Sequence, residues 1–473
     1  MWISRTLLCG LLCGLLAGFV SAPPARGQEP ERFPVGRLVE RVAAVRDPTQ
    51  TYALYLPSAY TPEKKFPALL IFDPRGRAML AAELFVAAAE AHGWILLSSW
   101  DTRSDGPMEP NRKALDALWP EVHERFPTDW RRIYAAGFSG GAMLAFSFGL
   151  GTGELAGVIG CGGRPEEHNR KARGTFAHFG VAGRTDFNYS PMRLLDSQVE
   201  GWGVPHWFEA FDGPHAWMPA ALAGKAIAWM EIQAMHAGLR APDAGIVADF
   251  FAQEIAAARS LEESGRPLEA LRRYRLAAAT VGALGDPQAV AAARDAAERL
   301  AASSAVELAQ KEERKWDGAE AAYLGRIGWL GPALAQRDPP IRSSEIVTRL
   351  EIHGLRKRAA AGGYAGIAAE RTLESLFSLL AFYETRDLFA AGEWQAAATA
   401  LEVALAIKPE RGDAWYNLAC AQARARNPRR ALEALERAVD NGFSSAEQMR
   451  GDPDLESLRD TPEFQRILAG LAG

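Results

Sequence analysis

The stretch that decides the fold is AAGFSGGAMLAF, residues 135–146. It places Ser139 among several glycines, after an apolar run typical of a buried strand and before a run typical of a helix. Small residues beside a serine let the chain turn sharply enough to lift the hydroxyl above the edge of a sheet. The pattern Gly-x-Ser-x-Gly in this context favours a nucleophilic serine over a structural serine in a glycine-rich loop.

A serine hydroxyl is a weak nucleophile, so a general base and an orienting acid are expected elsewhere in the chain. Asp186 follows the strand-like run FAHFGVAG, and His215 follows the run HWFEAF inside a Gly-Pro loop. Parallel strands end at one edge of a sheet, where open α/β folds place their sites. The order Ser139, Asp186, His215 therefore predicts a catalytic triad at that edge.

Other residues compete for two of these roles. Asp186 also suits the cap of the helix expected after it, and Asp212 is an alternative acid in the last loop. His178 and His206 are alternative bases, but they lie inside strand-like runs, which is more typical of structural histidines. We favour Asp186 and His215 because both follow the ends of strands.

The fold class follows from the alternation of elements between residues 50 and 235. Short runs rich in β-branched and aromatic residues alternate there with helical runs, which indicates crossover units. This alternation predicts an α/β domain over residues 45–237, with a mostly parallel sheet covered by helices on both faces.

The second part of the chain, residues 246–473, is expected to be all-α, since strand signals stop there. Segments near 392–410 and 426–444 superpose with an offset of 34 residues, and a third segment near 265–280 matches them. A helix-turn-helix period of this length resembles the tetratricopeptide repeat. The clearest repeats are expected at 251–284, 378–411 and 412–445.

The phrases RFPTDWRRIYAAGFSGGA and FDGPHAWMP make the first part resemble an α/β-hydrolase, specifically a secreted esterase of the polyester-depolymerase or feruloyl-esterase kind. The resemblance implies an oxyanion hole made by backbone N–H groups, one of them from Gly140. Such enzymes usually carry His-Gly after the third strand, whereas this chain has Asp73-Pro74-Arg75. Proline has no N–H, so the second donor is expected to be the amide of Arg75.

Four further side chains are candidates for substrate binding. Trp100 and Asp101 follow a strand, Arg77 lies beside the expected oxyanion segment, and Trp217 follows His215. Arg75 and Arg77 would favour a substrate carboxylate at the pocket mouth, although solvent-facing loop arginines are an equal alternative. The sequence has no metal-ligand spacing, phosphate loop or dinucleotide motif, so no cofactor and no metal are expected.

The composition and the N-terminal segment limit the partners and the cellular location that we expect. A formal net charge of −5 gives no basic field for nucleic acid. Residues 1–27 read as a signal peptide, with an apolar run and a small-residue cleavage site. We expect a periplasmic or extracellular protein, with an uncleaved membrane anchor as the alternative. The mature chain then has only Cys161 and Cys420, which excludes a disulfide framework.

Together these features predict an exported serine hydrolase that cleaves carboxylic esters through an acyl-enzyme, with repeats that dock a protein partner. Residues 28–240 are expected to fold alone. One alternative is a prolyl-oligopeptidase-like peptidase, which shares the order of the triad. The other is a catalytically weak scaffold that acts through its repeats, for which the altered oxyanion segment is the only support.

Overall fold

The computed structural model describes residues 32–165, 173–336, 338 and 340–471. The expected signal peptide lies outside the described residues. Among those residues, no helix is long and apolar enough to cross a membrane.

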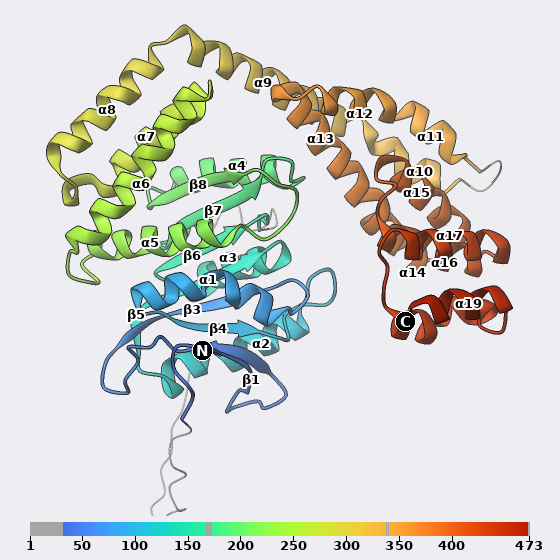
Figure 1. Cartoon of the computed structure of the whole chain (residues 1–473), viewed down its shortest axis with the longest axis horizontal. Helices are drawn as coiled ribbons and strands as arrows, with labels where there is room; N and C mark the ends of the chain where they lie inside the picture. The colour runs from blue at the N-terminus through green and yellow to red at the C-terminus, as the bar shows by residue number, and fades with distance from the viewer. Residues whose placement is uncertain (1–31, 166–172, 337, 339, 472–473) are drawn as a thin grey trace, which may run out of the picture. The chain divides into compact units, whose positions relative to one another are not determined.

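The first part of the chain forms one eight-stranded sheet in the order β1-β2-β4-β3-β5-β6-β7-β8 (Figure 1). Strand β2 is antiparallel to both of its neighbours, and β3 to β8 are parallel. The strands are β1 Leu38–Ala43, β2 Thr51–Tyr55, β3 Phe66–Phe72, β4 Ile95–Ser99, β5 Thr128–Phe138, β6 Gly157–Cys161, β7 Ala177–Gly183 and β8 His206–Phe211. Only β1 falls outside the strand-like runs of the sequence.

Helices cover both faces of the sheet, as β6 shows. A Cβ placed on Gly157 would meet Met230, whereas the next residue, Val158, packs against Gly149. Successive side chains of a strand point to opposite faces, so the helices carrying Met230 and Gly149 lie on opposite sides. The predicted fold class is confirmed. The helices are α1 Ala78–His92, α2 Glu109–Pro120 with its π-helical end η1 Glu121–Arg125, α3 Gly140–Thr152, α4 Tyr189–Glu200 and α5 Ala220–His236.

The second part is helical, as expected, and Asp243, Asp286 and Ser303 cap three of its helices. Its first helices are α6 Ala244–Glu263, α7 Pro267–Val281, η3 Gly282–Leu284, α8 Pro287–Ala301, α9 Ser304–Leu324, η4 Ile327–Trp329 and α10 Leu330–Leu334. They are followed by α11 Ser343–Arg349, α12 Ile352–Ala360, α13 Gly363–Ser378, η5 Leu379–Glu384, α14 Thr385–Ala390 and α15 Trp394–Ile407. The last are α16 Gly412–Arg424, α17 Pro428–Asp440, α18 Ala446–Gly451, η6 Pro453–Leu458 and α19 Pro462–Leu471.

The hydrophobic core does not divide at the sequence-based boundary near residue 245. One core runs from the sheet through α5 into α6, α7, α8 and the first turn of α9, and a second core begins at Leu330. Trp207 of β8 meets Phe250 of α6 edge-on with 5.8 Å between ring centroids. The indole of Trp229 in α5 donates a hydrogen bond to Thr280 of α7 over 3.1 Å. The first helices of the second part therefore fold against the sheet.

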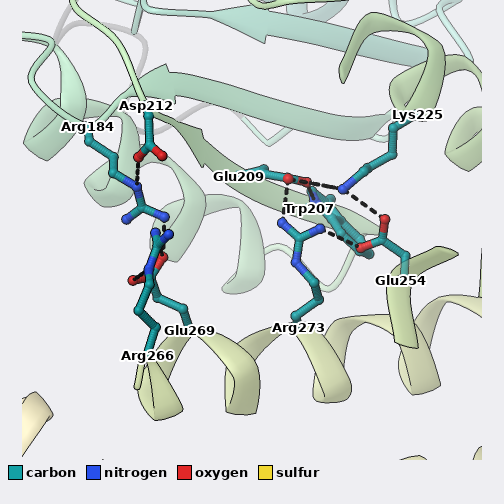
Figure 2. Close-up of polar contacts among 9 residues, drawn as sticks. All are labelled: Arg184, Trp207, Glu209, Asp212, Lys225, Glu254, Arg266, Glu269 and Arg273. Carbon is teal, nitrogen blue, oxygen red and sulfur yellow. Dashed lines mark hydrogen bonds and ion pairs between the residues drawn. The ribbon is translucent and has the colours of Figure 1, made fainter. Parts of the chain in front are cut away.

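Charged side chains, most of them partly buried, reinforce this junction (Figure 2). Lys225 Nζ lies 2.8 Å from carboxylate oxygens of both Glu209 and Glu254, and Arg273 pairs with the same two carboxylates. Burial alone would raise the pKa of Glu209, but Lys225 and Arg273 hold it below its usual value. Two cations and two anions thus neutralise one another between β8, α5, α6 and α7.

Candidate active site

Ser139 occupies a strained turn between β5 and α3. Its backbone has φ 52° and ψ −122°, in a region that residues other than glycine seldom adopt. The glycines beside it permit the turn, since a Cβ on Gly137 would collide with the backbone of Gly141, and one on Gly141 with the Phe72 carbonyl. Such strain costs about 1–3 kcal/mol and persists only where the surrounding structure enforces it. Here it holds the hydroxyl at the edge of the sheet.

The three predicted triad residues meet in one hydrogen-bonded line. His215 Nε2 lies 3.0 Å from Ser139 Oγ, and His215 Nδ1 lies 2.9 Å and 3.0 Å from the two carboxylate oxygens of Asp186. Asp186 is fully buried, whereas the His215 side chain keeps 19% of its surface exposed. A neutral His215 that donates from Nδ1 to Asp186 accepts the serine proton at Nε2.

The competing residues lie apart from this line. Asp212 forms an ion pair with Arg184 Nε over 2.7 Å, and the His206 ring contacts the carbonyl of Val204. His178 is buried edge-on against Phe146 with 5.2 Å between ring centroids, and burial lowers its pKa to about 3. His178 is therefore a neutral core residue.

Asp186 also organises its own turn, but it does not cap the following helix as the alternative proposed, because the N-cap of α4 is Asn188 and has no side-chain cap. Asp186 Oδ1 accepts a hydrogen bond from the Asn188 amide over 2.7 Å, and the Asn188 side chain donates to the Gly162 carbonyl, also over 2.7 Å. Gly162 has φ 59°, and a Cβ there would meet Asp186 Oδ2 and His215 Nδ1. Sequence reasoning missed Gly162 and Asn188, although the pair Gly162-Gly163 directly after a strand-like run was an available signal.

Two aromatic rings hold the imidazole of His215. The rings of Phe138 and Phe187 lie with centroids 4.6 Å and 4.3 Å from it, both tilted. Both phenylalanines adjoin a triad residue in sequence.

The turns that carry Asp186 and His215 are tied together beyond the sheet. Arg184 N donates to the Phe211 carbonyl over 2.8 Å, and Thr185 donates to the Gly213 carbonyl from both its amide and its hydroxyl. The Arg184 side chain adds ion pairs to Asp212 and to Glu269 of α7 (Figure 2). A carboxylate of the helical part therefore pairs with the arginine two residues before Asp186.

The two amides expected to form the oxyanion hole, those of Gly140 and Arg75, differ in whether they already have a hydrogen-bond acceptor. Gly140 begins α3, and the first amides of a helix have no acceptor one turn earlier, so its N–H is available. The Arg75 amide instead donates to Asp73 Oδ1 over 2.8 Å, which closes the turn after β3. The structure does not present the Arg75 amide to a substrate, because the Asp73 carboxylate occupies it.

Asp73 is fully buried and accepts hydrogen bonds from several groups, whereas sequence reasoning treated it only as a departure from the family pattern. It accepts hydrogen bonds from the Arg75 and Arg77 amides, from the Arg77 guanidinium at 2.8 Å and 3.0 Å, and from the Trp217 indole at 2.8 Å. Burial would raise the pKa of Asp73, but these donors hold it below its usual value. Arg77 and Trp217, expected to line a pocket, are thereby bound to Asp73.

Trp100 and Asp101 are engaged with the first strands of the sheet. The Trp100 indole donates to the Glu40 carbonyl over 2.8 Å, with the Arg41 guanidinium 4.4 Å above its ring. Asp101 accepts the Thr51 amide over 2.6 Å. The structure thus links both residues to β1 and β2, and does not bring them to the triad.

A group with metal-ligand geometry among the described residues lies in the helical part. It consists of Cys420, Asp452 and Asp454. Asp452 already accepts the Tyr416 hydroxyl over 2.7 Å and the Asp454 amide over 2.9 Å, and burial raises the pKa of the Cys420 thiol. These contacts cap η6, and the cysteine is a buried thiol.

The sheet order, the strained serine and the hydrogen-bonded triad together define an α/β-hydrolase fold, which is followed by a helical repeat region. Residues 388–449 match the model of the tetratricopeptide repeat, which spans α14 to α18. A chloroplastic protein from Arabidopsis thaliana is 35% identical over 80 residues, or 16% of this chain. The match covers 24% of that protein, so the chain spans about a quarter of the length of this relative.

Solved serine hydrolases are similar to the first part of the chain. The fluorophosphonate-binding serine hydrolase F of Staphylococcus aureus is 16% identical with a TM-score of 0.35, over 41% of this chain and 98% of that chain. The S-formylglutathione hydrolase of the same organism is 17% identical with a TM-score of 0.33, over 42% and 98%. Est1E from Butyrivibrio proteoclasticus is 12% identical with a TM-score of 0.32, over 39% and 94%. At these values the fold assignment depends on the sheet order and the triad.

Proposed function

We propose that the chain is a serine hydrolase that cleaves carboxylic esters through an acyl-enzyme. The observation that carries the proposal is the line from Ser139 Oγ to His215 Nε2, 3.0 Å long, continued from Nδ1 to the buried Asp186. A buried carboxylate fixes the tautomer of the imidazole and stabilises its charged form.

The reaction then proceeds in two halves. Ser139 Oγ attacks the ester carbonyl while His215 Nε2 takes its proton, and the tetrahedral oxyanion faces the Gly140 amide at the start of α3. As the carbon–oxygen bond to the alcohol breaks, His215 returns the proton to the leaving alcohol. Water, activated by the same histidine, hydrolyses the acyl-serine and releases the acid.

Fewer charged side chains are available to contact a substrate than the sequence implied. Arg77 is neutralised by Asp73, so it offers no free charge to a substrate carboxylate. The Arg75 side chain is exposed and has no ion-pair partner among the described residues, so it remains the cation available beside the turn. We propose ester substrates, small or polymeric, whose acyl and alcohol groups are set by the loops above the triad.

Export and docking complete the proposal. The expected signal peptide supports a periplasmic or extracellular location, with an uncleaved anchor as the alternative. The tetratricopeptide match at residues 388–449 supports a protein-binding role for that part of the chain. N-terminal sequencing of the protein recovered from the cell envelope tests the first point, since it must begin near residue 28.

A fluorophosphonate probe tests the chemistry. The wild-type protein should be labelled at Ser139 and should turn over p-nitrophenyl esters, whereas Ser139→Ala should do neither. Ser104→Ala removes another hydroxyl, one that is hydrogen-bonded to Asp105, and should keep both activities. An unlabelled wild type beside an active esterase contradicts the proposal, and cleavage of peptide amides without esters would favour a peptidase.

A further inference from the structure

Arginines at the junction of the sheet and α7 all have carboxylate partners. Figure 2 shows Arg184 with Asp212 and Glu269, Arg266 with Glu269, and Arg273 with Glu209 and Glu254. A cavity of about 370 Å³ lies at this junction, and its charges are satisfied from within the chain. Each of these arginines is already paired with a carboxylate of the chain and is not available to bind an external anion.

A second cavity, of about 400 Å³, has a different charge pattern. It is formed by α9, η4, α12, α13 and the turn after α11. Arg326, Arg349 and Arg358 line it, all three are exposed, and none has an ion-pair partner among the described residues. Three unpaired guanidinium groups therefore converge on one cavity.

The acidic residues of this cavity do not neutralise the arginines. Glu320 is buried and pairs with Arg371, whose Nε and second guanidinium nitrogen lie 2.8 Å and 2.6 Å from one carboxylate oxygen. Glu351 is exposed and is the remaining acid in the lining. Three unpaired cations against one unpaired anion leave the cavity electropositive, although the chain as a whole has a formal charge of −5.

Aromatic rings orient two of the arginines. The Arg349 guanidinium carbon lies 3.7 Å from the centroid of the Trp329 ring, and that of Arg358 lies 5.6 Å from Trp316. A guanidinium stacked on an indole is held flat and keeps its N–H groups at the edge free for a carboxylate. Small residues of α13, Ala365, Ala368 and Ala369, also line the cavity and leave room for a ligand.

We propose that this cavity binds an organic carboxylate whose planar, apolar body lies against the tryptophans. Guanidinium groups bind carboxylates through paired hydrogen bonds, and a volume of about 400 Å³ lies within the usual range of ligand sites. The carboxylate belongs either to a free aromatic acid or to an acidic peptide. The site is separate from the triad and does not depend on the proposed hydrolase activity.

Isothermal titration of the full chain with two matched probes tests the site. The probes are 2-naphthoate and the neutral 2-naphthamide, and an acetylated Trp-Glu-Glu-Glu peptide represents the peptide source. We expect naphthoate or the peptide to bind at least tenfold more tightly than naphthamide, with affinity falling as salt rises. Tighter binding of one of the two anions identifies the source.

Variants locate the binding. Arg349→Gln and Arg358→Gln should each weaken the better anion about tenfold, as loss of a charge-assisted pair does. Lys357→Gln removes the same charge from a position on α12 outside the lining, and should leave binding within about twofold, because Lys357 does not reach a ligand in the cavity. Unchanged melting curves confirm that the variants fold. Equal affinity for naphthamide, no binding at millimolar concentration, or binding that survives Arg349→Gln overturns the proposal.

Discussion

The helices α6 and α7 and the helices α15 to α17 have the same sequence pattern but different structural roles. In the first group Phe250 packs on Trp207 of the sheet, and Glu254 pairs with Lys225 of α5. In the second group the helices pack on one another, with Tyr416 stacked on Phe443 at 4.2 Å inside a separate core. A helical repeat can therefore become part of an enzyme's core, and its period does not reveal which role it has.

Truncating the chain should show the largest difference between the helices that pack on the sheet and those of the second core. Residues 28–240 alone would expose Trp207 and Trp229 and leave Glu209 and Lys225 without half of their partners. Removing a buried tryptophan typically costs about 3–5 kcal/mol, so exposing both approaches the whole stability of a domain. Contrary to the sequence-based expectation, we expect this fragment to be insoluble or unfolded, as judged by size exclusion and circular dichroism.

A longer fragment provides the control. Residues 28–325 keep the first core intact and lack the second, so they should remain soluble and hydrolyse small esters. If the shorter fragment is as stable and active as the longer one, the first helical group is not part of the enzyme core and the comparison fails.

Acid should destabilise the sheet before the second core. The folded protein keeps His178 neutral down to a pKa of about 3, whereas the unfolded chain protonates it near 6.5. The unfolded state thus binds more protons in this window, and the contribution of His178 to stability falls as the pH drops, by about 2 kcal/mol between pH 6.5 and 4.5. Chemical denaturation at both pH values should show a larger fall in stability for the wild type than for His178→Phe, since the raised pKa of Asp196 acts in the opposite direction in both proteins. An equal fall in the variant would assign it to other groups.

The smallest expected effect concerns Glu269. Replacing it with glutamine removes the charge from α7 that pairs with Arg184, two residues before Asp186, while keeping the shape of the side chain. We expect kcat for small esters to fall about two- to fivefold with KM unchanged, since a partly exposed pair contributes roughly 1 kcal/mol or less.

Glu262→Gln is the matched control for that measurement. It breaks an exposed ion pair with Arg299, of 2.7 Å, between α6 and α8 and should leave kcat unchanged. Equal effects of both variants would mean that Glu269 acts on general stability and not on the triad turns.

The sequence predicted those features that depend on local pattern. The glycine-flanked Ser139 and the order of Asp186 and His215 follow from short motifs at strand ends, and the alternation of runs predicts the sheet. Strand β1 was missed because its short run LVERVA contains two charges and lies at the edge. The roles of Trp100 and Asp101 depend on contacts with β1 and β2, which no local pattern reveals.

Long-range contacts account for the rest. Asp73 and Trp217 are 144 residues apart, and only the folded chain shows that one binds the other. The same holds for Gly162, whose missing side chain matters because Asp186 and His215 occupy that space. The core continues past the sequence-based boundary near residue 245 for a related reason, since Trp207 and Trp229 look like ordinary core residues until α6 and α7 are placed on them.

The hydrogen bonds of Asp73 also restrict how positions 73 and 217 can change in related sequences. One carboxylate closes the turn after β3 and anchors the indole that follows His215. Once Asp73 is replaced, the indole of Trp217 has lost its hydrogen-bond acceptor. A later substitution of Trp217 then removes little further stabilisation. We therefore expect the two positions to vary together among descendants of this chain, so that lineages which lose the aspartate also drift at the tryptophan.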